Sequence, residues 1–187
     1  MEILTAAVGR GQTGEITTPL PEFRGLSIHF VASRMRAVIQ RVLRAQVSVG
    51  EEVIGRIGPG LLVLIGVSKA DIQADADYVA TKITGLRIFD DPEGKMNIAL
   101  ADTKGAVLAV SQFTLYGDVR RGKRPSFDEA ATPEHARELY EYFVTKIHLA
   151  GFICETGRFQ AMMQVELVNE GPVTILLDSK KSTLKTC

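Results

Sequence analysis

The chain has 187 residues with 22 basic and 22 acidic side chains, so its formal net charge at pH 7 is zero. Apolar residues make up 45% and charged residues 24%, which excludes global disorder. The longest apolar run, residues 61–67, is about a third of a membrane span, so a membrane location is not expected. Zero net charge gives no general argument for nucleic-acid binding. We expect no DNA partner, and any RNA must be held by a local basic patch.

Two stretches of the chain differ from the rest. Residues 1–34 contain scattered glycines and prolines without a lasting period, and they lack the basic start and apolar centre of a secretory signal. We expect a disordered extension there, or translated sequence upstream of a natural start at Met35. Residues 35–180 should form one domain, and residues 181–187 a frayed tail. Cys154 and the final Cys187 cannot make a disulfide framework, which indicates a reducing compartment.

The first half of the domain begins with strands. Residues 38–49 are rich in β-branched side chains, and a turn at 50–52 returns the chain as a strand at 53–57. Residues 61–67 have the apolar run of a buried strand. One helical face follows, because apolar residues recur at steps of four and three: Ile72, Ala76, Val79, Ile83 and Leu86.

The second half continues the alternation. A turn at 90–94 precedes an apolar strand at 106–113. Thr132 and Pro133 predict the start of a second helix, which should end by Gly151. Strands at 163–167 and 173–177 complete a mixed α+β domain of about seven strands and two helices.

Several common chemistries do not fit the sequence. The histidines are His29, His135 and His148, and the last two lie 13 residues apart in one predicted helix without a cysteine pair. That spacing argues against a zinc site and gives no placed histidine for a Ser-His-Asp triad.

Three polar segments remain as candidates. Residues 111–118, at a strand end, form either an ordinary turn or a pocket rim of hydroxyl, amide and backbone N–H groups. Residues 118–125 form either a solvated loop or a phosphate-contacting loop. Residues 169–174 read as a β-turn followed by a proline that opens the next strand.

Together these segments resemble a known family. Ser111-Gln112-Phe113-Thr114-Leu115 and Asn169-Glu170-Gly171-Pro172-Val173-Thr174 are similar to the two signature motifs of the D-aminoacyl-tRNA deacylases. The opening at residues 35–42 and the segment at residues 121–127 also resemble that family, in the same order. The second motif more often has aspartate where Glu170 stands, an exchange that keeps the charge.

The resemblance implies a fold and an activity. It implies a cytoplasmic homodimer built on a small closed, barrel-like, mostly antiparallel β-sheet with two main helices outside. The implied reaction is hydrolysis of the ester joining a D-amino acid to the 3′-terminal ribose of tRNA, and of glycine mischarged on tRNA for alanine. L-aminoacyl-tRNA would be rejected by a cis Gly171–Pro172 bond that reaches into the partner subunit's pocket. No metal or organic cofactor is implied.

The resemblance also assigns residues. Phe113 and Thr114 would be catalytic, with backbone N–H groups there stabilising the oxyanion. Ser111, Gln112, Gly171 and Pro172 would bind the substrate. The tRNA would be bound by the basic residues Arg120, Arg121, Lys123 and Arg124. Thr114 is a pocket residue first and a nucleophile second, since no nearby histidine or lysine would activate it. Two other functions stay open: a non-catalytic module that binds the tRNA 3′ end for proofreading, and a small-ester hydrolase that uses Thr114.

Overall fold

The structure, a computed structural model, describes residues 35–179, so the predicted extension (1–34) and tail (181–187) lie outside the described residues. Eight strands, two α-helices and two 3₁₀ helices follow one another within this range. The strands are β1 (Arg36–Val49), β2 (Glu52–Ile57), β3 (Gly60–Gly66), β4 (Arg87–Asp90), β5 (Met96–Ala99), β6 (Ala106–Ser111), β7 (Cys154–Thr156) and β8 (Gln164–Asp178). The helices are α1 (Gln73–Gly85), η1 (Leu100–Asp102), η2 (Phe113–Tyr116) and α2 (Pro133–Leu149).

The main sheet is mixed and nearly closed, and three of its five strand pairings are antiparallel, as expected for a mostly antiparallel sheet. Its strand order is β2-β1-β3-β6-β7, and β8 pairs with β1. The partners of β1 are antiparallel, whereas β3–β6 and β6–β7 are parallel. The parallel pairs arise because α1 lies between β3 and β6 in the chain, and α2 between β6 and β7, as helical crossovers.

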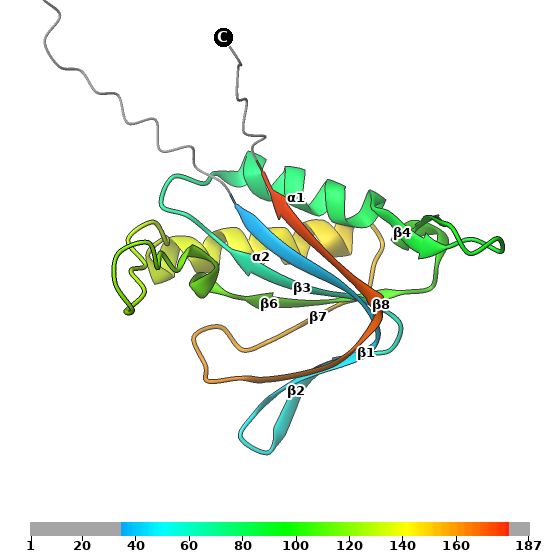
Figure 1. Cartoon of the computed structure of the whole chain (residues 1–187), viewed down its shortest axis with the longest axis horizontal. Helices are drawn as coiled ribbons and strands as arrows, with labels where there is room; N and C mark the ends of the chain where they lie inside the picture. Colours follow the sequence, from blue (N-terminus) through cyan, green and yellow to red (C-terminus); the bar gives the residue numbers. More distant parts are fainter. Residues whose placement is uncertain (1–34, 180–187) are drawn as a thin grey trace, which may run out of the picture. The chain divides into compact units, whose positions relative to one another are not determined.

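Both helices lie on one side of β1, β3 and β6, and β1 and β8 curl away from them toward β2 (Figure 1). Two buried clusters result. Val63 of β3 faces the helices and packs in the cluster that contains Phe143 of α2. The neighbouring Leu62 points to the opposite face and packs inside the curl of the sheet. Residues 61–67 are continuously apolar because this strand is buried on both faces.

The first three strands and both helices confirm most of the predicted pattern. The side chain of Thr132 caps α2 by accepting a hydrogen bond from the His135 N–H at 3.5 Å. The strand predicted at 106–113 is shorter, and its end was predicted wrongly. Its neighbour β3 ends at Gly66, one residue beyond the last pair with β6 (Ile65 with Ser111), so the chain loses its partner and turns into η2.

The two predicted strands at 163–167 and 173–177 are one strand, β8, because both halves pair with β1. Asn169 bridges the irregular middle: its side-chain amide donates to the carbonyls of Arg41 (2.8 Å) and Val173 (3.1 Å). The short β4–β5 hairpin and the three-residue β7 were not predicted, because so few residues leave no period to read. No helix in residues 35–179 is long and apolar enough to cross a membrane.

Candidate active site

A cavity of about 700 Å³ opens where β6 ends. Three separate segments form its walls: residues 110–114, the start of α2 around Pro133, and the residues just before and within β8 from Phe159 to Val165. The site therefore exists only after α2 and β8 have returned to the end of β6.

The cavity brings together the four residues predicted from the first motif. Ser111, Gln112, Phe113 and Thr114 all line it. The side-chain amide of Gln112 donates a hydrogen bond to the Thr114 hydroxyl, so that oxygen is already engaged as an acceptor. Phe113 is 56% exposed and packs edge-on against Phe127 with ring centroids 5.0 Å apart. The roles assigned to these residues stay predictions.

Backbone N–H groups at the start of η2 are available to a ligand. Gln112 donates its N–H to the Ile65 carbonyl at 2.7 Å, and Leu115 donates to the Gln112 carbonyl at 3.3 Å. Phe113 and Thr114 lie between these two residues, and their N–H groups have no hydrogen-bond acceptor within residues 35–179. Two adjacent donors beside a cavity suit a developing oxyanion.

None of the lining residues that the structure describes has an ionisable side chain. The walls consist of apolar side chains with two amides and two hydroxyls, so no side chain there can act as a strong general base. Residues 35–179 also contain no cluster of three or more histidine, cysteine, aspartate or glutamate side chains able to hold a metal ion. Among the described residues, this cavity therefore offers backbone dipoles, amides and hydroxyls to a reaction.

The wall around Phe159 was missed by sequence reasoning. The Arg137 guanidinium lies 4.6 Å from the centroid of the Phe159 ring, and the centroid of the Tyr140 ring lies 6.0 Å from it. The hydroxyl of Tyr140 donates to the Ala109 carbonyl at 2.9 Å, which ties this wall to β6. The only available signal was an aromatic residue in the connection between β7 and β8.

The predicted basic loop follows η2 directly. Asp118 and Ser126 close it with two backbone hydrogen bonds of 2.8 and 3.0 Å. Arg120 is bound to Asp118 through its guanidinium, and this hydrogen bond lowers the pKa of the Asp118 carboxyl to about 2. No described residue forms an ion pair with the other three cations, which we term the unpaired loop cations: Arg121, Lys123 and Arg124. Three of the four predicted tRNA-binding residues therefore present their charge to solvent.

The second motif lies away from the cavity of its own chain. The Gly171–Pro172 bond is cis, and both residues are exposed. Gly171 lies six residue steps along β8 from Val165 at the cavity wall, about 20 Å at 3.3 Å per residue. Behind the motif lies the buried Arg41, whose Nε is 3.4 Å from a carboxylate oxygen of Glu170. Within one chain, Gly171 and Pro172 therefore do not lie beside residues 111–114. The prediction that they face these residues in a partner subunit stays a prediction.

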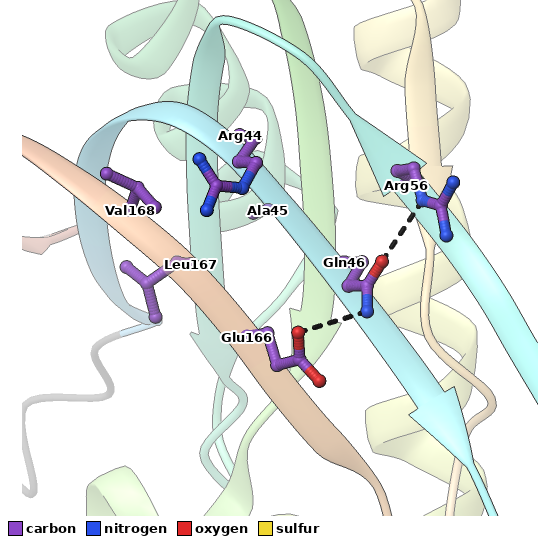
Figure 2. Close-up of a pocket in the computed structure, with 7 residues that line it drawn as sticks. All are labelled: Arg44, Ala45, Gln46, Arg56, Glu166, Leu167 and Val168. Carbon is purple, nitrogen blue, oxygen red and sulfur yellow. Dashed lines mark hydrogen bonds between the residues drawn. The ribbon is translucent and has the colours of Figure 1, made fainter. Parts of the chain in front are cut away.

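A second hollow of about 260 Å³ lies on the outer face of β1, β2 and β8 (Figure 2). Three of its polar side chains bind one another: Arg56 donates to Gln46 and Gln46 donates to Glu166, each at 3.1 Å. The cavity beside η2 is the better candidate, because it holds the predicted motif residues and two N–H groups without an acceptor in residues 35–179.

Comparison with known proteins gives consistent matches. The family model for D-Tyr-tRNA(Tyr) deacylase matches residues 38–178. A D-aminoacyl-tRNA deacylase of Koribacter versatilis (strain Ellin345) is 66% identical over 147 residues, which is 79% of this chain and 99% of the relative. A protein of the same name from Symbiobacterium thermophilum is 63% identical over 148 residues, 79% of this chain and 98% of the relative.

Two solved structures are similar in fold to this chain. The c-Myc DNA unwinding element binding protein superposes with a TM-score of 0.73 at 40% identity, covering 78% of this chain and 99% of its own. A probable eukaryotic D-amino acid tRNA deacylase superposes with a TM-score of 0.68 and the same coverage, but at 19% identity it supports the fold alone.

Proposed function

The chain belongs to the D-aminoacyl-tRNA deacylase family and is a hydrolase of ester bonds, and on that premise we propose how it selects and cleaves its substrate. It releases D-amino acids from tRNA in the cytoplasm, and it also removes glycine mischarged on tRNA for alanine. The observation that carries the mechanism is the cavity beside η2, with two unpaired backbone donors and no ionisable wall residue.

Such a cavity suits an aminoacyl ester. This ester is already activated, so hydrolysis needs no strong nucleophile from the protein. The N–H groups of Phe113 and Thr114 stabilise the oxyanion that forms when water attacks, and one such donor is typically worth about 3–4 kcal/mol of barrier. The ribose 2′-hydroxyl next to the ester positions or activates the water.

Thr114 is a pocket residue in this proposal. Its hydroxyl accepts a hydrogen bond from Gln112, and no wall residue is a base that would activate it. Thr114→Ala should reduce kcat by less than about tenfold, whereas removal of a nucleophile costs several orders of magnitude. Rapid-quench assays that trap a covalent aminoacyl adduct on Thr114 would overturn this assignment.

We propose that the enzyme is a homodimer in which Gly171–Pro172 of the partner subunit enters the cavity and excludes L side chains. The exposed position of this segment, far from its own cavity, supports a role in another chain. Leu176 is 79% exposed and points to the same side of β8 as Pro172. In register beside it lies the half-buried Val38 of β1, so a strip that runs from the motif past the polar Thr174 and Gln40 ends in an apolar pair. A second copy of this chain would cover that strip.

The unpaired loop cations bind the acceptor end of the tRNA. They follow η2 in the chain, and Phe127 of the same loop touches Phe113 at the cavity. Phosphates held there would place the 3′-terminal ester beside the two backbone donors.

Residues 35–180 are proposed to be sufficient for activity. The Met35 N–H donates to the Ser179 hydroxyl at 3.0 Å and the Ser179 N–H donates to the Met35 carbonyl at 2.9 Å, so the two ends of the described range hold each other. A chain that starts at Met35 should keep the melting temperature and activity of the full chain. Aggregation of that shorter chain would contradict this proposal.

The decisive experiment compares matched D- and L-aminoacyl-tRNA as substrates of the purified full chain. Release of the D-amino acid with the L-ester left intact supports the proposal. Binding of both without release would indicate a non-catalytic proofreading module. Equal hydrolysis of a short ester that lacks ribose would indicate a small-ester hydrolase.

A further inference from the structure

The orientation of η2 depends on contacts from outside the helix. It has four residues, and its ends are marked by hydrogen bonds of 3.3 Å (Leu115 N–H to Gln112 carbonyl) and 2.9 Å (Gly117 N–H to Thr114 carbonyl). Short 3₁₀ segments have poor hydrogen-bond geometry and do not hold their own orientation well. Yet Phe113 and Thr114, the first two residues of η2, line the cavity and carry the two N–H groups that have no acceptor in residues 35–179.

Arg36 binds the C-terminal end of η2. It is the first residue of β1 and lies in register between Gly66 of β3 and Asp178 of β8. Its Nη1 donates to the Leu115 carbonyl at 2.9 Å, and its guanidinium carbon lies 4.8 Å from the centroid of the Tyr116 ring. The last carbonyls of a helix have no partner within the helix, and cationic side chains commonly bind them. One planar group therefore holds both final residues of η2 against the main sheet.

We infer that Arg36 is a positioning residue for the deacylation reaction, holding η2 so that the N–H groups of Phe113 and Thr114 point at the ester. This inference rests on the proposed function and adds a residue outside the cavity to it. A guanidinium suits the task because its flat face covers the tyrosine ring while its edge donates to the carbonyl. Lysine can form the hydrogen bond but lacks the flat face.

A matched control separates this role from the general stability of the sheet end. Arg36 also forms an ion pair with Asp178 at 3.6 Å, in which both side chains are 42% exposed. Exposed pairs of this kind contribute little. Asp178→Asn removes the pair and leaves the Leu115 and Tyr116 contacts, whereas Arg36→Met removes all three.

The experiment measures steady-state kcat and KM for the hydrolysis of D-aminoacyl-tRNA. It compares the full-length wild type with three variants: Arg36→Met, Arg36→Lys and Asp178→Asn. Arg36→Met should lower kcat by about 10- to 100-fold, the usual effect of a small misplacement of catalytic groups, with KM within about threefold. Arg36→Lys should recover part of that loss, and Asp178→Asn should match the wild type. The inference is overturned if Arg36→Met keeps full kcat, or if Asp178→Asn lowers kcat to the same extent.

A second readout does not depend on activity. The amide NMR shifts of Phe113 and Thr114 should move in Arg36→Met and stay in place in Asp178→Asn. Unmoved shifts in Arg36→Met would also overturn the inference. If the wild type fails to hydrolyse D-aminoacyl-tRNA, the proposed function fails, and these shifts still decide whether Arg36 positions η2.

Discussion

Gly66→Ala tests whether close packing of η2 on β3 sets the catalytic geometry. A Cβ at Gly66 would lie 2.9 Å from Cε2 of Tyr116, 3.1 Å from the carbonyl oxygen of Gln112 and 3.2 Å from Cβ of Leu115. Two of these three contacts are with atoms of or next to the main chain, which cannot rotate away. The η2 segment must therefore move off the sheet, by about half an ångström to restore ordinary van der Waals separations.

The magnitude follows from this displacement. Overpacking of this kind costs about 1–3 kcal/mol of folding free energy. For a domain of this size that corresponds to a fall in melting temperature of about 3–9 °C. Since misplacement by about 1 Å can cost a hundredfold in rate, kcat should fall about tenfold or more. Thermal unfolding and single-turnover deacylation of D-aminoacyl-tRNA measure the two effects.

Gly85→Ala is the matched control, because a Cβ at Gly85, the last residue of α1, meets no atom within 4 Å. It should keep wild-type kcat and melting temperature. The reasoning is refuted if Gly66→Ala behaves like Gly85→Ala. A Gly66→Ala protein that is less stable but fully active would refute the catalytic part alone.

Three further predictions concern charge and burial. Replacing the unpaired loop cations by alanine should raise KM and reduce the log–log salt slope of tRNA binding by about 2. Arg120→Ala should change this slope little, because Asp118 already binds that cation. An unchanged slope in the triple variant would place the tRNA elsewhere. Burial raises the pKa of the Cys154 thiol to about 12. In a Cys187→Ser chain this thiol should therefore resist alkylation at pH 8 until denaturant is added. Rapid labelling of the native protein would contradict its burial. Burial also raises the pKa of Tyr140 above its ordinary 10.0, so the folded state keeps this proton to higher pH than the unfolded state. The free energy of unfolding should therefore fall as pH rises through about 10. The urea midpoint of Tyr140→Phe should fall less steeply with pH than that of the wild type, and parallel curves would exclude this residue as the cause.

The comparison of β6 with β8 shows where local pattern reaches its limit. The apolar run that begins at residue 106 predicted a strand correctly, but its end depends on where β3 stops pairing, which lies more than 40 residues earlier in the chain. For β8 the error was the reverse. Gly171 and Pro172 read locally as a turn, yet pairing with β1 on both sides makes one strand of two halves.

The site divides in the same way. Sequence by itself determined the helices, the apolar strands, the motif residues 111–114 and the family, because periodicity, capping and motif spacing are local properties. It could not determine that Phe159 closes the cavity or that Arg36 holds η2. Those contacts join residues as far as 79 positions apart. Only tertiary structure decides them, because the curl of β1 and the two helical crossovers set which distant side chains meet.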